Sequence, residues 1–360
     1  MKNIDTLDVQ LCVKPSAKDL IKSRLTPNDD TRYGVGGCYY GHHFTQPVGF
    51  VYICRGCYLI IELSHEFMVG IETSSELQEK VIQMLVDYFH ISTDDIVKYK
   101  VVKTPTSKIR VRCNSGKYIT RKIGGNKIHQ DLVEINRIEM KTDYRLKVAD
   151  EQLIAQDIFR ITADKSNRCV KELSIYPNRT NCEYKSSSNN SIAITCYFKE
   201  YERLEEGDVA GAEKFKDILR TEVKCKNKHL NNNRNKMDKT LVNYFSPSVA
   251  GDYFNKYVVP IFGENEFYRL DIAQLEIYKN ELLKDFEKDR LYQFLENINK
   301  FGISEVKEMY DSNTFREYSK KINKMGINIL CFSPVIDGKK ITIKKMDNFT
   351  LFINGIDSDI

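Results

Sequence analysis

The sequence predicts an α+β protein: a duplicated antiparallel sheet with helices on one face and pseudo-twofold symmetry, followed by a mainly helical C-terminal domain. Up to residue 236, segments with alternating apolar and polar residues are interleaved with amphipathic helical segments, and beyond it helical segments predominate. An internal repeat indicates the duplication. We therefore expect two domains, residues 1–236 (halves at about 45–150 and 170–236) and residues 237–360.

The first half contains a predicted hairpin, a helix and a strand. Apolar alternation over residues 49–63 predicts the hairpin, and LVEINRIEMK at 132–141 predicts the strand. Residues 74–89 have the spacing of an amphipathic helix, with Ser75 as a candidate cap. Residues 1–48 are rich in glycine and aromatic residues and indicate only turns and short strands.

The central element of the second half is SIAITCYFKEYER, residues 191–203. Its first nine residues alternate like a strand, with Ile192, Ile194, Cys196 and Phe198 on one face and Ala193, Thr195, Tyr197 and Lys199 on the other. We expect the apolar face to pack in a core and the second face to present a phenol beside an ammonium group. A helix is expected over 209–217 and a further strand over 217–230.

The repeat consists of two segments with the pattern R-x-E-x-K, at residues 137–141 and 220–224. Each follows a predicted strand with a charged end and an intervening helix, so a strand–helix–strand unit is present twice. Duplication would bring five side chains to one shared surface: Glu62, Glu139, Tyr197, Lys199 and Glu222. For either copy alone, a ladder of ion pairs across strands is the simpler interpretation.

Helical segments are predicted beyond residue 240, at 253–257, 272–286, 291–301, 304–310 and 314–325. The last three have a spacing close to that of a helix-turn-helix, and KKITIKK with FTLFING has the composition of a small hairpin. A plain helical accessory bundle is an equally good interpretation of the same pattern.

Positive charge is concentrated in one stretch of the chain. The net charge is only +5, from 55 Lys and Arg against 50 Asp and Glu, yet residues 96–130 contain ten Lys or Arg and no acid. Clustered positive charge is typical of a nucleic-acid partner. The candidate DNA-binding residues are Lys108, Arg110, Arg112, Lys117, Arg121, Lys122, Arg137, Arg220 and Lys224.

The composition indicates a cytoplasmic protein without a membrane partner. No apolar run approaches the roughly 20 residues that span a bilayer, the N-terminus is not a signal peptide, and the ten cysteines are scattered. Cys54-x-x-Cys57, with Cys38 and His42 or His43 upstream, has zinc-like spacing. However, Cys54 and Cys57 flank a predicted turn and pair more simply across strands. No glycine-rich phosphate loop is present, which argues against an ATP-driven helicase.

Tyr197 and Lys199 suit phosphodiester chemistry. A phosphotyrosyl bond conserves the energy of the broken phosphodiester, so resealing needs no nucleotide cofactor. A phenol has a pKa near 10, so the site must favour the phenolate, and Lys199 is the candidate source of positive charge. Mg²⁺ or Mn²⁺ would stabilise charge on phosphorus and prefers carboxylate oxygens, for which Glu62, Glu139 and Glu222 are the candidates.

Four segments in order resemble the gene II type replication initiators of filamentous phages and related plasmids: LIIELSHEFMVG, INRIEMKTDY, AITCYFKEYER and LRTEVKCKNKHL. The resemblance covers roughly residues 50–235, with a looser match in the C-terminal part. It implies a site-specific nickase that starts rolling-circle replication, becomes attached to the 5′ phosphate, frees a 3′ hydroxyl as primer and later rejoins the displaced strand.

The resemblance also implies roles for individual residues. Tyr197 would be the nucleophile and Lys199 its companion, with Glu62, Glu139 and Glu222 as acids. Glu139 stands where the family often has Asp, which lengthens that ligand by one methylene. Implied partners are double- or single-stranded origin DNA, a host helicase and a polymerase.

Several alternatives remain open. The main one is a non-catalytic, sequence-specific DNA-binding regulator of replication, in which the acidic pairs are structural. A recombinase or a mobilisation relaxase would share the tyrosine chemistry. Tyr184, in a polar segment predicted to be a loop, and Tyr201, near the strand end, are rival nucleophiles. No His-hydrophobic-His metal motif is present, because His42 and His43 are adjacent and would point to opposite faces of a strand.

Overall fold

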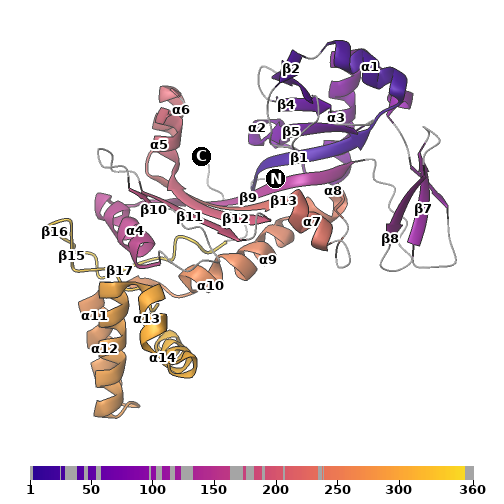
Figure 1. Ribbon diagram of the computed structural model, residues 1–360. Coiled ribbons are helices and arrows are strands. Elements are labelled where there is room, and N and C mark those ends of the chain that lie inside the picture. Colours follow the sequence, from indigo (N-terminus) through magenta and orange to yellow (C-terminus); the bar gives the residue numbers. More distant parts are fainter. Residues whose placement is uncertain are drawn as a thin grey trace. The chain divides into compact units, whose positions relative to one another are not determined.

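The chain forms two compact units in a computed structural model (Figure 1). Unit 1 consists of Met1–Met140 and Lys224–Ala250, and unit 2 of Lys141–Val223 and Gly251–Ile360. The structure describes residues 3–24, 26–28, 39–43, 48–53, 58–96, 99–102, 108–113, 118–122, 133–162, 173–175, 182–188, 191–205, 207–233, 237 and 239–352.

Unit 1 contains an antiparallel sheet in the strand order β9-β1-β5-β4-β3-β2 and a separate sheet β6-β7-β8. Its strands are β1 (Ile4–Cys12), β2 (Thr26–Asn28), β3 (Tyr39–His43), β4 (Val48–Ile53), β5 (Tyr58–Ser64), β6 (Tyr99–Val102), β7 (Lys108–Cys113), β8 (Tyr118–Lys122) and the first part of β9 (Glu134–Arg145). Its helices are α1 (Pro15–Ser23), α2 (His65–Met68), α3 (Ser74–Phe89), α7 (Asn227–Asn233) and α8 (Leu241–Tyr244).

Unit 2 combines strands in the order β10-β11-β12-β13-β9 with most of the helices. Its strands are β10 (Leu173–Ile175), β11 (Cys182–Ser188), β12 (Ile192–Phe198), β13 (Ile218–Lys226), β14 (Phe267–Tyr268), β15 (Val335–Ile336), β16 (Lys339–Lys340) and β17 (Lys345–Met346). Its helices are α4 (Ala149–Thr162), α5 (Lys199–Glu205), α6 (Val209–Lys214), α9 (Pro247–Tyr257), α10 (Val259–Phe262), α11 (Leu270–Lys279), α12 (Asp285–Phe301), α13 (Ile303–Met309) and α14 (Ser312–Lys324). The predicted α+β class is confirmed.

β1 is a central strand that the sequence analysis did not predict. It pairs with β5 on one side and with β9 on the other, antiparallel to both. Leu7, Val9 and Leu11 are at most 1% exposed and alternate with polar residues, so one face of β1 belongs to the core. The other face carries Asp8, whose role is described below.

The predicted helix over residues 74–89 is confirmed as α3. Leu77, Val81, Leu85 and Phe89 are fully buried at the spacing of one helix face. Thr73, and not Ser75, is the cap: its hydroxyl accepts a hydrogen bond from the Glu76 amide, and the Glu76 carboxylate accepts one from the Thr73 amide. This capping box satisfies amide groups that would otherwise lack partners at the helix start.

The alternation predicted for the central strand is confirmed in β12. Ile192, Ile194 and Cys196 are buried, whereas Ala193 and Thr195 are half-buried. The strand ends at Phe198, so the prediction that Lys199 lies on the strand is wrong, and Lys199 is the first residue of α5. The predicted strand over 217–230 is also shorter than expected, because helix α7 begins at Asn227.

The two copies of the repeat have different strand neighbours. β12 is followed by α5, α6 and then β13, and β13 is its direct neighbour in the sheet. In the first copy, β5 is followed by α3 and later by β9, but β1 lies between β5 and β9. The pseudo-twofold arrangement is therefore not confirmed by the strand order.

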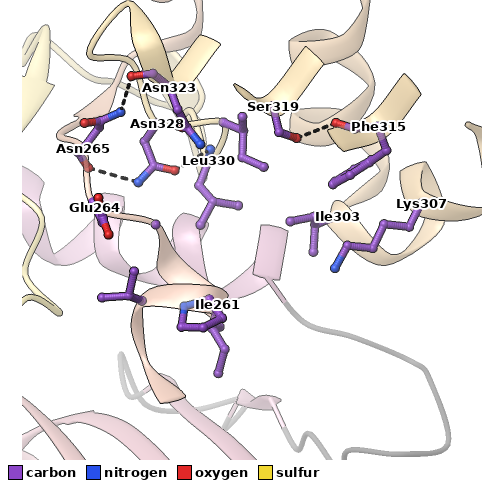
Figure 2. Close-up of a pocket in the computed structure, with 14 residues that line it drawn as sticks. Ile261, Glu264, Asn265, Ile303, Lys307, Phe315, Ser319, Asn323, Asn328 and Leu330 are labelled. Atoms are coloured by element: carbon purple, nitrogen blue, oxygen red, sulfur yellow. Dashed lines mark hydrogen bonds between the residues drawn. The ribbon is translucent and has the colours of Figure 1, made fainter. Parts of the chain in front are cut away.

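The C-terminal helices belong to the same unit as residues 141–223, so the unit boundaries differ from the predicted domain boundary after residue 236. Phe159 of α4 is fully buried and makes edge-to-face contacts with Phe262 and Phe349. Residues of α10, α13 and α14 line a pocket of about 460 Å³ within this unit (Figure 2).

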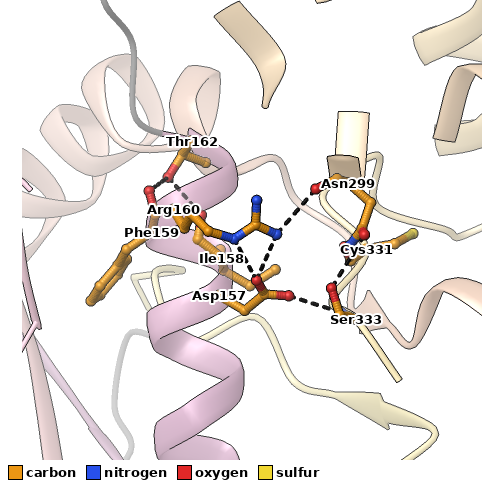
Figure 3. A network of polar contacts seen from close by, with 8 residues as sticks. All are labelled: Asp157, Ile158, Phe159, Arg160, Thr162, Asn299, Cys331 and Ser333. Atoms are coloured by element: carbon orange, nitrogen blue, oxygen red, sulfur yellow. Dashed lines mark hydrogen bonds and ion pairs between the residues drawn. The ribbon is translucent and has the colours of Figure 1, made fainter. Parts of the chain in front are cut away.

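A polar network attaches α4 to the same C-terminal segment (Figure 3). The carboxylate of Asp157 accepts hydrogen bonds from the backbone amide of Ser333 at 2.8 Å and from Nε of Arg160 at 2.8 Å. Arg160 also donates to the carbonyl of Asn299 at 3.0 Å. These contacts, together with the aromatic cluster, explain why the two segments form one unit.

The small hairpin near the C-terminus differs from the predicted one. Val335–Ile336 pairs with Lys339–Lys340 around Asp337 and Gly338, which both have positive φ. Asp-Gly with two positive φ values suits the twist of a two-residue hairpin. Strand β17, from the predicted KKITIKK segment, pairs instead with β14.

None of the described helices is both long and apolar enough to cross a bilayer. Helix α12 has 17 residues and contains several charged side chains. A membrane-spanning helix needs about 20 predominantly apolar residues.

The packing of α4 gives a stability prediction. We expect Phe159→Ala to lower the free energy of unfolding by about 3–5 kcal/mol, because it leaves a cavity among buried rings. Leu282→Ala is the control, since Leu282 is 93% exposed, and it should change stability by less than about 0.5 kcal/mol. Urea unfolding followed by circular dichroism measures both, and equal effects would contradict the packing described.

Candidate active site

Tyr197 lies on β12 with its hydroxyl directed at a carboxylate of the neighbouring strand β13. The hydroxyl donates a hydrogen bond to Oε1 of Glu222, with an O–O distance of 2.6 Å. Tyr197 is 9% exposed and Glu222 is 7% exposed, so the pair is largely shielded from water. Glu222 can therefore accept the proton of the phenol directly.

Lys199 lies close to the same ring, although not on the strand. Its Nζ is 5.7 Å from the centroid of the Tyr197 ring, and the side chain is buried. It forms an ion pair with Glu202 one turn later in α5. The sequence therefore placed Lys199 beside Tyr197 correctly, but the contact arises from the start of a helix.

This arrangement places a proton acceptor and a cation beside the phenol. A carboxylate within hydrogen-bonding distance is placed to act as general base toward the hydroxyl. An ammonium group near the ring favours the phenolate by attraction between opposite charges. Glu222, expected as a metal ligand, is thus occupied by the tyrosine.

The rival tyrosines have other settings. Tyr184 is a residue of strand β11, opposite Cys196 of β12, and not of a loop. Tyr201 belongs to helix α5, where its hydroxyl accepts a hydrogen bond from Gln152 at 3.2 Å. For Tyr144, burial and then the charges of Glu151 and Asp347 raise the pKa, which keeps that phenol neutral.

A cluster of charged side chains in unit 1 surrounds the guanidinium of Arg137. Its Nη2 donates to Oδ1 of Asp8 at 2.9 Å and pairs with Oε2 of Glu62, and its Nη1 lies 3.2 Å from Oε1 of Glu139. Nζ of Lys224 is 2.9 Å from the same oxygen of Glu139. The structure thus brings Glu62 and Glu139 together, as predicted, but around a cation of the protein itself.

Strand pairing builds this cluster. In the register of β1, Asp8 is opposite Glu62 on β5 and also opposite Arg137 on β9, while Thr6 is opposite Glu139. Asp8 is fully buried, so its charge needs a partner, and Arg137 supplies it. Asp8 was not among the candidate residues predicted from the sequence. The signal that could have found it is the alternation of Leu7 and Val9 on either side of it.

The carboxylates do not fit a metal ion as they are arranged. Hard divalent cations require several free oxygen ligands, but Arg137 and Lys224 already engage Glu62 and Glu139, and Tyr197 engages Glu222. Among the residues that the structure describes, no group of three or more His, Cys, Asp and Glu side chains could hold a metal ion. Cys38, Cys54 and Cys57 of the zinc alternative lie outside the described residues.

Two of the candidate DNA-binding arginines are engaged by acids. Arg220 is 1% exposed, donates to both oxygens of Asp143 at 2.7 and 2.8 Å, and lies over the ring of Phe215. Such a bidentate, buried pair is structural, so Arg220 does not present its charge to DNA. Arg137 is likewise enclosed by carboxylates.

The basic segment forms the predicted short strands. Lys108, Arg110 and Arg112 are on β7, Arg121 and Lys122 are on β8, and Lys117 lies outside the described residues. The register pairs Lys108 with Lys122 and Arg110 with Thr120. Because strand positions alternate between faces, Lys108, Arg110, Arg112 and Lys122 occupy positions of one face and Arg121 of the other.

Comparison with known proteins gives no assignment: no protein-family model matches the chain, and no curated protein matches it. The resemblance to phage initiators rests on four short motifs. The chemistry of the described side chains therefore carries the functional argument.

The Arg137 cluster gives a second stability prediction. Arg137→Met leaves a buried carboxylate without its partner, so we expect a loss of about 3–5 kcal/mol in the free energy of unfolding. Adding Asp8→Asn to the Arg137→Met variant should recover part of the lost free energy of unfolding. Lys147→Met is the control, because its pair with Asp347 is exposed on both sides and is worth at most about 1 kcal/mol. An Arg137→Met effect as small as the control in urea unfolding would overturn the assignment.

Proposed function

We propose that this chain is a rolling-circle replication initiator that nicks its origin with Tyr197 as nucleophile. The observation that carries the proposal is the 2.6 Å hydrogen bond from the Tyr197 hydroxyl to Glu222, in a site where both side chains are largely buried. The Y-x-K motif of the resemblance places the nucleophile at the same residue.

In the proposed reaction, the Tyr197 oxygen forms a bond to phosphorus while Glu222 accepts the phenol proton. The bond from phosphorus to the 3′ oxygen breaks, and this oxygen takes up a proton to become the 3′ hydroxyl. The DNA is then held through a 5′-phosphotyrosyl ester. Because the ester retains the energy of the broken bond, a 3′ hydroxyl can reverse the reaction and join the strand.

Lys199 is assigned to stabilise the phenolate. Its ammonium lies 5.7 Å from the centroid of the Tyr197 ring. The ion pair with Glu202 weakens the electrostatic effect of the Lys199 ammonium at the Tyr197 phenol. This effect increases when the ion pair separates. Because Tyr197 is 9% exposed, DNA reaches the hydroxyl only when the surrounding side chains move.

The proposal includes a requirement for Mg²⁺ or Mn²⁺, which rests on the resemblance and on donor chemistry. As they are arranged, the described carboxylates Asp8, Glu62 and Glu139 do not fit such an ion, because Arg137 engages all three. The ion would have to compete with this guanidinium. It would supply charge stabilisation at phosphorus.

We further propose that β9 and β13 derive from a duplication and that the chain acts in the cytoplasm with origin DNA, a host helicase and a polymerase. The support for the duplication is the shared R-x-E-x-K pattern, placed in each case on a long strand. The different neighbours of the two strands require that one copy changed its pairing after duplication.

A non-catalytic DNA-binding regulator is the second candidate. It is favoured by the engagement of every predicted acid in a hydrogen bond or ion pair, and by the lack of a metal-binding group among the residues that the structure describes. A regulator binds DNA without breaking it and needs no phenol hydroxyl, so strand cleavage separates the two candidates.

Cleavage by variants tests the nucleophile and its base. On a supercoiled plasmid that carries the origin, wild-type protein should give nicked circles with protein attached to the 5′ end. Tyr197→Phe should abolish nicking, and Glu222→Gln should slow it about 10²–10⁴-fold, because the proton acceptor is lost.

Tyr201→Phe is the matched control and should nick like wild type, since the hydroxyl of Tyr201 accepts a hydrogen bond from Gln152 and is not bonded to Glu222 in the proposed reaction. Denaturing gels resolve the products. Nicking by Tyr197→Phe at the wild-type rate would refute the assignment of the nucleophile, and origin binding without any nicking by wild type would favour the regulator.

Chelation tests the metal requirement separately. We expect EDTA to abolish nicking and Mg²⁺ or Mn²⁺ to restore it, while the affinity for origin DNA in a gel-shift assay stays the same. Nicking that persists in EDTA would remove the metal from the proposal and leave the Tyr197–Glu222 pair intact.

A further inference from the structure

Helix α14 is fixed to its neighbours by one face. Asp311 caps it by accepting hydrogen bonds from the amides of Asn313 and Thr314, both at 3.0 Å. Phe315 and Tyr318 make edge-to-face contacts with Phe294 of α12. The helix is therefore held in place by an aromatic core and a cap.

The opposite face of α14 is basic. Arg316, Lys320 and Lys324 recur every four residues and are all exposed. At 100° per residue, they share an arc of about 140° with Ser312, Asn313, Ser319 and Asn323. This arc contains no acid. Glu317 lies just outside its edge and pairs with Lys321.

The surface along this arc is hollowed. Arg316, Ser319, Lys320, Asn323 and Lys324 line a groove together with Phe315. Figure 2 shows Ser319 and Asn323 also at the adjoining pocket, whose lining includes Lys307 of α13 and one acid, Glu264. Cations and amide groups therefore project along one recessed strip.

Helices α13 and α14 resemble the arrangement of a helix-turn-helix. Helix α13 has seven residues, and Tyr310 and Asp311 connect it to the thirteen residues of α14. Tyr310 contacts both Phe294 and Tyr318, which fixes the turn against the core. In such motifs the second helix presents its exposed side to DNA.

We propose that the exposed face of α14 is a DNA-binding site that enters the major groove of the origin duplex. Arg316, Lys320 and Lys324 contact phosphates or guanine edges, and the amides of Asn313 and Asn323 contact adenine edges. This site is additional to the basic strands β7 and β8. The inference rests on the proposed function in taking the origin duplex as the DNA that is bound. The contacts themselves follow from the side chains of α14.

Charge and composition select duplex DNA over other polyanionic surfaces. A helix that lies on a membrane carries large apolar side chains next to its lysines. None of the exposed large apolar residues among the described part of the chain belongs to α14. Asparagine and serine between the cations supply hydrogen bonds to base edges instead.

The test compares two triple variants with the same change in charge. One variant removes the α14 cations by Arg316→Gln, Lys320→Gln and Lys324→Gln. The other removes exposed cations outside α14 by Arg290→Gln, Lys300→Gln and Lys340→Gln. Fluorescence anisotropy measures binding to an origin duplex and to a scrambled duplex over a salt series. Thermal unfolding checks that both proteins remain folded.

We expect the α14 variant to bind the origin duplex at least tenfold more weakly, with a smaller salt slope, by about one for each lost phosphate contact. The control variant should bind like wild type. Asn313→Ala with Asn323→Ala should lower the preference for the origin over the scrambled duplex and leave the salt slope unchanged. Equal binding by wild type and the α14 variant would overturn the inference.

A single-stranded oligonucleotide with the nick site separates this inference from the proposed function. The α14 variant should cleave it at the wild-type rate, because Tyr197 and Glu222 are untouched. Failure of wild type to cleave it would refute the proposed function without affecting the duplex result. The assignment to DNA would be overturned if wild type bound duplex RNA or anionic vesicles as tightly as duplex DNA and the α14 variant lost that binding.

Discussion

Charged side chains buried on neighbouring strands must be paired, and this constraint determines how the sheet is assembled. Asp8 is fully buried and Arg220 is 1% exposed, and an unpaired charge in such a position costs several kcal/mol. Asp8 is paired with Arg137, and Arg220 with Asp143. A one-residue slip of either strand would move these charges to the apolar face, so the ion pairs and the strand register depend on each other.

The same requirement generates the proposed chemistry. Glu222 is buried and needs a hydrogen-bond donor, and the donor in the structure is the hydroxyl of Tyr197. A pair that satisfies burial is then also a phenol in contact with a proton acceptor. At Arg137 the outcome is different, because a permanently charged guanidinium neutralises the acids and leaves no proton to transfer. Burial of similar R-x-E patterns therefore produces a hydrogen-bonded phenol–carboxylate pair in one place and a cluster of ion pairs in the other.

Local patterns in the sequence predicted the elements, but not the partners of the charged residues. Alternation placed Tyr197 on the polar face of β12, and helical spacing predicted α3. Asp8 was missed because its partners lie on strands distant in the sequence. Lys199 was assigned to the strand, but the run after Phe198 forms a helix with an ion pair between Lys199 and Glu202. The hairpin was predicted in KKITIKK with FTLFING but forms around Asp337-Gly338, and the predicted helix over 272–286 ends at Lys279, before an irregular connection to α12.

The most direct test of the account is to identify the residue that becomes bonded to DNA. Wild-type protein is incubated with a single-stranded oligonucleotide that contains the nick site, digested with trypsin and nuclease, and analysed by mass spectrometry. Trypsin cleaves after Lys185, Lys199 and Arg203, so Tyr184, Tyr197 and Tyr201 fall on three different peptides. The account predicts a nucleotide adduct on the peptide from residue 186 to 199. An adduct on either neighbouring peptide, or none from protein that binds the origin, would contradict it.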